Sequence, residues 1–117
     1  MKYIIAIIRP EKLEDVRAAL AERDVYLMTV SEVQGFGRQR GTTEVYRSQE
    51  VEERLVPKLK VEIAVTAAFA EAAIEAIVRA ARTGETGRVG DGKIFVLDLH
   101  DCVRIRTGET GAQAIGP

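Results

Sequence analysis

The spacing of apolar residues along the chain predicts its helices and strands. Residues 2–8 are almost all apolar, which is typical of a central strand buried on both faces. Leu13, Val16 and Leu20 follow at helical spacing after Pro10, and they predict a helix that ends near Arg23. The β-branched residues of the range 25–33 then predict a second strand.

The same order of elements recurs in the second half of the chain. Apolar residues at the odd positions from 59 to 65 alternate with Lys60 and Glu62, which predicts a strand over 58–65 with one buried face. Residues 69–82 are alanine-rich and predict a helix whose polar residues form one stripe, in which Glu75 and Arg79 can pair. Residues 93–99 predict a fourth strand.

Two successive β-α-β units predict a single α+β domain over residues 1–117. Such units form a ferredoxin-like βαββαβ fold, a four-stranded antiparallel sheet with both helices on one face. That arrangement leaves the other sheet face bare, although the first strand is apolar on both sides. An exposed apolar face needs a cover, and in a chain with no spare segment we expect further copies of the chain to supply it.

Three segments fall outside this pattern. The segment of about 37–57 is polar and highly charged, and a connection of about 20 residues inside a compact domain is usually functional or disordered. Residues 83–93 are rich in glycine. After the fourth strand we expect an extended stretch that places Arg104 and Arg106 on one face, and then a mobile tail over 107–117.

Composition narrows the classes of function. The 117 residues carry a net charge of −1, which gives no basic field for nucleic acid. No apolar run approaches the roughly 18–20 residues of a membrane span, and the first ten residues lack the cleavage site of a signal peptide. With one cysteine, an internal disulfide is excluded. We therefore expect a soluble cytoplasmic protein without direct membrane insertion.

The glycine-rich segment TGETGRVGDGKI is the strongest candidate for chemistry. Glycines beside a lysine leave backbone N–H groups free to approach a phosphate, although a long flexible turn has the same composition. The stretch GRVGDGK resembles a P-loop, but Ile94 replaces the Mg²⁺-binding hydroxyl and a strand follows instead of a helix. The segment is therefore not a P-loop of an NTPase.

Basic residues gather at the predicted ends of elements. Arg38, Lys58, Lys93, Arg104 and Arg106 could together hold a polyphosphate, whereas each one alone reads as a surface cation. Neither the single histidine nor the single cysteine has a partner marked by spacing, and no pair of carboxylates has an evident acid–base spacing. The sequence thus does not indicate an enzyme.

The order of several motifs resembles the PII nitrogen-regulatory signal-transduction proteins over nearly the whole chain. The matching segments are MTVSEVQGFGRQRG (28–41), TEVYR (43–47), LVPKLKVEI (55–63), GDGKIFV (90–96) and RIRTGE (104–109). The resemblance implies a homotrimer of ferredoxin-like subunits that binds ATP or ADP between subunits, with Mg²⁺ and with 2-oxoglutarate as an effector.

The resemblance also assigns residues by position. For the nucleotide it implies Thr29, Gly37, Arg38, Thr83, Gly90, Asp91, Gly92, Lys93, Arg104 and Arg106. For 2-oxoglutarate it implies Gln39, which would also meet Mg²⁺, together with Lys58 and Lys93. The loop of about 37–57 would contact a regulated partner, a transporter or an enzyme, and its order would change with the bound ligand.

Two departures from the family pattern change this picture. Val51 stands where many members carry the tyrosine that is uridylylated, so this modification is excluded, and Tyr46 and Ser48 are left as candidate sites or as ordinary loop residues. The glycine-rich segment is also about three residues longer than the TGxxGDGK form, within 85–89. This added length could alter the preference between ATP and ADP.

Three functions follow as hypotheses. The first is a non-enzymatic sensor that binds nucleotide and 2-oxoglutarate and regulates a partner in nitrogen metabolism. The second is a divergent relative that binds nucleotide but serves another partner, such as a metal-efflux transporter, without sensing 2-oxoglutarate. The third is a small phosphatase or phosphotransferase on the same fold.

Overall fold

The computed structural model describes residues 1–39 and 52–116. Its elements are β1 (Lys2–Ile8), the 3₁₀ turn η1 (Pro10–Lys12), α1 (Leu13–Ala21), β2 (Thr29–Gln39), β3 (Glu52–Val65), α2 (Ala67–Ala81), β4 (Gly92–Asp98) and α3 (Ala112–Ile115). No helix within these described ranges has the length and apolar character needed to span a bilayer.

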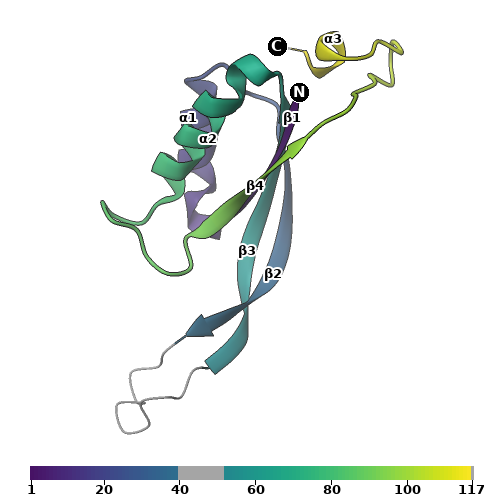
Figure 1. Cartoon of the computed structure of the whole chain (residues 1–117). Helices are drawn as coiled ribbons and strands as arrows, with labels where there is room; N and C mark the ends of the chain where they lie inside the picture. Colours follow the sequence, from purple (N-terminus) through teal and green to yellow (C-terminus); the bar gives the residue numbers. More distant parts are fainter. Residues whose placement is uncertain (40–51, 117) are drawn as a thin grey trace, which may run out of the picture.

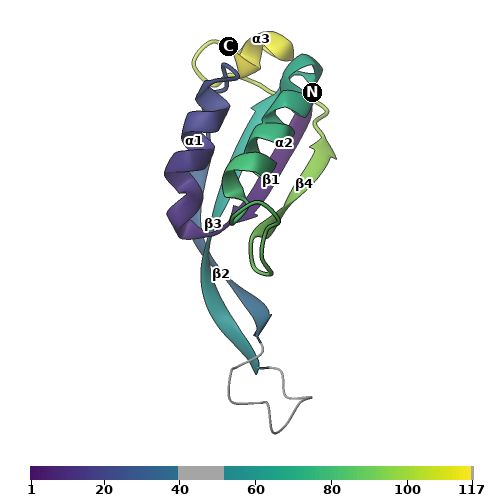
Figure 2. The same ribbon diagram turned by 90° about the vertical axis from the view of Figure 1, so that its left-hand side faces the viewer.

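The four strands form one sheet in the order β2-β3-β1-β4, and all neighbours are antiparallel. Helices α1 and α2 lie side by side on the same face of this sheet (Figure 1, Figure 2). The ferredoxin-like arrangement predicted from the two β-α-β units is therefore confirmed.

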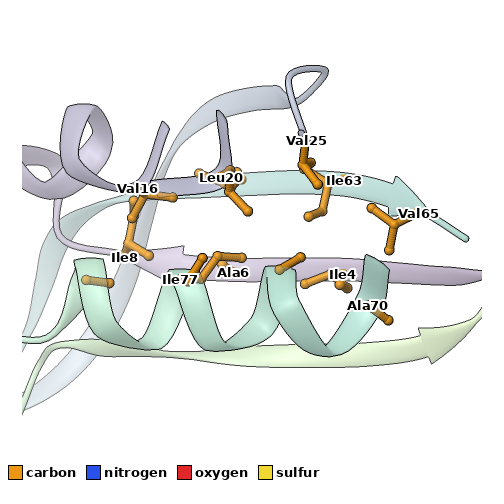
Figure 3. Close-up of a cluster of buried hydrophobic side chains, with 14 residues drawn as sticks. Ile4, Ala6, Ile8, Val16, Leu20, Val25, Ile63, Val65, Ala70 and Ile77 are labelled. Carbon is orange, nitrogen blue, oxygen red and sulfur yellow. The ribbon is translucent and has the colours of Figure 1, made fainter. Parts of the chain in front are cut away.

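The core lies between the two helices and the sheet (Figure 3). Ile4 and Ile8 of β1 are buried against Leu20 of α1 and Ile77 of α2, and all four are at most 1% exposed. Burying a side chain of this size stabilises the fold by about 1.5–3 kcal/mol. Successive side chains of a strand point to opposite faces of the sheet, so every second residue of β1 and β3 faces the helices and is buried.

The opposite, open face of the sheet also carries apolar side chains. Ile5 and Ile7 of β1 are only partly buried there, because their alternate neighbours take the helix side. Phe95 lies opposite Ile5 in the β1–β4 register, and both Phe95 and Leu97 are 47% exposed. The bare apolar face expected from the sequence is therefore present in the single chain.

The first helix and the second strand differ from their predicted bounds. Helix α1 ends at Ala21, and Asp24 reverses the chain at a φ of 62°. The Val25 N–H then donates to the Leu20 carbonyl at 2.9 Å, and the Val25 side chain is buried. The prediction of a strand over 25–33 was wrong at its start because Val25 closes the helix end, and β2 begins only at Thr29.

The polar segment predicted as an irregular loop over 37–57 is partly strand. Strands β2 and β3 continue as a two-stranded hairpin beyond the end of β1, with Gly37 opposite Arg54 (Figure 1). Both faces of such a ribbon meet solvent, because Phe36 on one face is 74% exposed and Arg54 on the other face is exposed as well. The sequence of the ribbon therefore needs no apolar alternation. Pro57 is tolerated in β3 because β1 ends opposite Leu59, which leaves one side of β3 unpaired there.

The segment after β4 also differs from the prediction. An extended stretch through Arg104 and Arg106 was expected, but residues 105–107 form a turn, closed by the Gly108 N–H donating to the Arg104 carbonyl at 2.7 Å. Gly108 has a φ of 75°, which allows this reversal. The tail predicted to be mobile then forms α3, whose Ala114 is 9% exposed.

Candidate functional site

The glycine-rich segment (residues 83–93) connects the end of α2 to the start of β4 (Figure 2). Gly90 and Gly92 have φ values of 99° and 103°, which side chains with a Cβ rarely adopt. The Gly90 N–H forms no hydrogen bond with another described residue. A strand follows the segment, as the sequence predicted, so the segment is not the loop of a P-loop NTPase.

Asp91 organises this segment with both of its carboxylate oxygens. Oδ1 accepts from the Thr83 hydroxyl at 2.6 Å and from Arg9 Nε at 2.9 Å, and Oδ2 accepts from the N–H groups of Thr83 at 3.0 Å and Arg88 at 2.8 Å. We call this arrangement of Arg9, Thr83, Arg88 and Asp91 the Asp91 clasp. It joins the two ends of the segment at its base.

The clasp keeps the Asp91 carboxylate ionised. Hydrogen bonds from the Thr83 hydroxyl and N–H hold the pKa of Asp91 well below its usual range, and Arg88 and Arg9 act in the same direction. The Arg9–Asp91 ion pair is partly buried, with side-chain exposures of 26% and 18%, so solvent screens it less than a surface pair.

Two cations lie beside Gly90. The Lys58 ammonium donates to the Gly90 carbonyl, and Arg9 Nη2 donates to the Val89 carbonyl at 3.0 Å. Burial lowers the pKa of Lys58, and the neighbouring Arg9 guanidinium lowers it further, although Asp91 and Glu11 act in the opposite direction. Because the positive charges of Lys58 and Arg9 are held close together, an anion bound beside Gly90 would relieve their repulsion.

A cleft of about 330 Å³ adjoins the segment between α2 and β4. Its walls include the apolar side chains of Ile74, Val78 and Val96, and it reaches Gly92 and the exposed Lys93 at the start of β4. A ligand held by Gly92 and Lys93 would therefore lie at the mouth of an apolar cleft.

The single chain brings together only part of the predicted nucleotide site. Five of the predicted residues lie in the glycine-rich segment: Thr83, Gly90, Asp91, Gly92 and Lys93. Lys58 reaches this segment from β3. In this group Asp91 acts on the protein itself, since its carboxylate binds neighbouring side chains and backbone. The predicted role of Asp91 in direct contact with a ligand stays a prediction.

The arginines of the C-terminal segment lie at the other end of β4 (Figure 1). Gly92 is opposite Ile8 and Asp98 is opposite Lys2, so the length of β1, roughly 20 Å, separates the two ends. Arg104 donates to Glu109 at 3.1 Å and to the Gln113 carbonyl at 3.0 Å, while Arg106 is exposed. One chain does not place these arginines at its own glycine-rich segment.

The remaining predicted residues are carried by β2 or lie outside the described residues. Thr29 is exposed and pairs with Glu62. It belongs to β2, which is the edge strand opposite β4. Gly37, Arg38 and Gln39 belong to the projecting hairpin. The modification candidates Tyr46 and Ser48, and Val51, lie in 40–51, which the structure does not describe.

Arg9 is the residue that the sequence analysis missed. It directly follows β1 and precedes Pro10, which favours an extended backbone at Arg9, observed at φ −66° and ψ 138°. Antiparallel pairing of β1 with β4 brings the end of β1 to the start of β4, so topology delivers Arg9 to Asp91. The position of Arg9 directly after the predicted central strand was the one feature of the sequence that could have indicated its place beside the glycine-rich segment.

Comparison with known proteins gives a consistent result. The family model described as nitrogen regulatory protein P-II matches residues 1–109. The chain is 53% identical to nitrogen regulatory protein P-II of Rhizobium meliloti and 52% identical to that of Klebsiella oxytoca, over 98% of the chain and 100% of each relative. It is 51% identical to nitrogen regulatory protein GlnK1 of Methanosarcina mazei, over 98% of the chain and 97% of that relative.

Proposed function

The chain belongs to the family of nitrogen regulatory proteins P-II, and from this premise we propose that it is a cytoplasmic, non-enzymatic regulator that binds ATP or ADP. Its output would be the control of a partner protein, a transporter or an enzyme, in nitrogen metabolism. The hairpin of β2 and β3 and the connection between them would contact that partner.

The observation that carries the proposal is that Lys58, Gly90, Gly92 and Lys93 lie at the same end of the sheet, where β1 ends and β4 begins. Glycines with positive φ values allow a ligand to approach the backbone closely, and ammonium groups supply the charge that phosphates need. The Asp91 clasp would hold this arrangement before the ligand arrives, which lowers the entropy cost of binding.

A complete site requires more than one chain. Thr29, Arg104 and Arg106 lie away from the glycine-rich segment of their own chain, so a neighbouring copy would have to supply them. The open apolar face of the sheet gives such copies a reason to associate. We therefore propose that the nucleotide binds at the subunit interfaces of a homotrimer. The Gln39 side-chain oxygen would be a ligand of Mg²⁺, and Lys58 and Lys93 would lie near 2-oxoglutarate.

The alternative is a family member that binds nucleotide but regulates a different partner, such as a metal-efflux transporter, without sensing 2-oxoglutarate. Val51 supports this alternative, because a valine cannot be uridylylated as the tyrosine hydroxyl of many family members is. The alternative keeps the nucleotide site and changes only the effector and the output.

Calorimetric titration with ATP and ADP, with and without Mg²⁺ and 2-oxoglutarate, separates these functions. We expect ATP binding that 2-oxoglutarate strengthens in the presence of Mg²⁺. ATP binding that 2-oxoglutarate leaves unchanged would favour the alternative, and absence of nucleotide binding would refute both. ATP turnover well above background would instead favour an enzyme.

Lys93→Ala tests the placement of the site. We expect weaker binding of both ATP and 2-oxoglutarate, because the change removes the ammonium next to Gly92. Lys12→Ala, which removes a lysine from the turn η1, is the matched control. Equal affinities in Lys93→Ala and the unmodified protein would show that the ligands bind elsewhere.

A further inference from the structure

Arg9 is not among the residues that the family resemblance assigns to a ligand, but its contacts connect it to the site. Its Nε binds Asp91 Oδ1 at 2.9 Å, and its Nη2 binds the Val89 carbonyl at 3.0 Å. One guanidinium therefore holds two points of the glycine-rich segment, on either side of Gly90. The planar fork of arginine fixes the geometry of such a double contact, whereas a lysine carries its donors on one nitrogen at the end of a flexible stem.

Asp91 transmits this contact to the rest of the segment. The same carboxylate binds the hydroxyl and N–H of Thr83 and the N–H of Arg88. Thr83 follows the end of α2, and Arg9 follows the end of β1, so the clasp fixes the segment to two rigid elements. We propose that Arg9 is a positioning residue for the anion-binding part of the segment (90–93), acting through Asp91.

The clasp also bears on the added length of this segment. Thr83 and Asp91 are joined directly, so residues 84–87 form a side loop whose ends are already fixed. A Cβ atom added to Gly84 would meet no other atom within 4 Å, and Glu85 and Thr86 are exposed. Of the range 85–89 that holds the added length, residues 85–87 therefore lie outside the base that positions Gly90 and Gly92, whereas Arg88 and Val89 belong to that base.

This inference rests on the proposed nucleotide site, and two independent measurements test it. The first is ATP affinity by calorimetry for Arg9→Met, Arg9→Lys, Asp91→Asn and the double variant Arg9→Met/Asp91→Asn. We expect Arg9→Met to weaken ATP binding about tenfold, the scale of one charged hydrogen bond. Arg9→Lys should recover part of this loss, since it keeps a positive charge beside Asp91.

The double variant separates positioning from direct contact with the ligand. If Arg9 acts through Asp91, the double variant should bind ATP no more than about twofold more weakly than Asp91→Asn alone. If the two losses multiply, Arg9 acts on the ligand by itself and the inference is overturned. Arg17→Met, which removes an arginine that pairs with Glu14 on α1, should leave the ATP affinity unchanged.

The second measurement needs no nucleotide. Hydrogen exchange of the peptide that covers 83–93 should be faster in Arg9→Met than in the unmodified protein, because the N–H groups of Thr83 and Arg88 donate to Asp91. Unchanged exchange together with unchanged ATP affinity would overturn the inference. If the unmodified protein binds no nucleotide, the proposed function fails, and unchanged exchange would then refute the clasp separately.

Discussion

Gly92 lies directly against the backbone of Ile7. A Cβ atom built on Gly92 would stand 1.7 Å from the Ile7 carbonyl oxygen and 2.8 Å from its carbonyl carbon. Real Cβ atoms do not approach a backbone atom so closely, and neither β1 nor β4 can move there without breaking the pair between Ile8 and Gly92. Glycine is therefore required at the point where the glycine-rich segment enters the sheet.

We predict that Gly92→Ala severely destabilises the protein, by more than about 3 kcal/mol, since the clash adds to the strain of a positive φ. Urea unfolding at fixed protein concentration measures the change. Gly84→Ala is the matched control, because Gly84 has a φ of 65° but nothing within 4 Å of its Cβ position. Its cost should be only about 1–2 kcal/mol. Equal losses in the two variants would contradict the role of Ile7.

Asp91 predicts a specific dependence of stability on pH. Its pKa is lower in the folded protein than in the unfolded chain, so its stabilisation is fully present above the unfolded value, near pH 4. The stabilisation is lost as the pH falls toward the folded value. Asp91→Asn should therefore be less stable than the unmodified protein at pH 7 by about 1.5–3 kcal/mol, and this difference should shrink below about pH 4.

Chemical unfolding between pH 3 and pH 8, with both proteins at one concentration, gives this difference. Asp15→Asn changes an exposed carboxylate in the first turn of α1 and should alter stability by no more than about 1 kcal/mol, the scale of its interaction with the helix dipole. A difference for Asp91→Asn that stays constant over the whole range would mean that the charge of Asp91 plays no part.

Periodicity predicted the fold because the burial it encodes is what holds the fold together. The alternation in β3 and the spacing of Leu13, Val16 and Leu20 correspond to the sides that face the core, and Arg79 pairs with Glu75 as the helical spacing indicated. The hairpin was missed because a ribbon with two solvent faces has no apolar alternation to detect. Its backbone pairing, such as Gly37 with Arg54, leaves no mark in composition.

The sequence predicted that the glycines and lysines of the candidate site lie together, but it did not predict the residues that support them. Local sequence marks Gly90, Gly92 and Lys93, since closely spaced glycines next to a lysine predict a turn whose backbone can adopt positive φ values and approach an anion. Arg9 is 82 positions away from Asp91 in the sequence, and only the antiparallel pairing of β1 with β4 joins them. The turn at 105–107 escaped prediction because Gly108 reverses a stretch that otherwise reads as extended.

The open face of the sheet gives a prediction about assembly. Phe95→Glu places a charge in the middle of the apolar band formed by Ile5, Ile7 and Leu97, and burying an unpaired charge costs far more than exposing it. We therefore expect sedimentation velocity to show trimers for the unmodified protein and mainly single chains for Phe95→Glu. Ala18→Glu, which adds the same charge to the exposed side of α1, should leave the trimer intact. If Phe95→Glu sediments like the unmodified protein, this face is not the interface between copies.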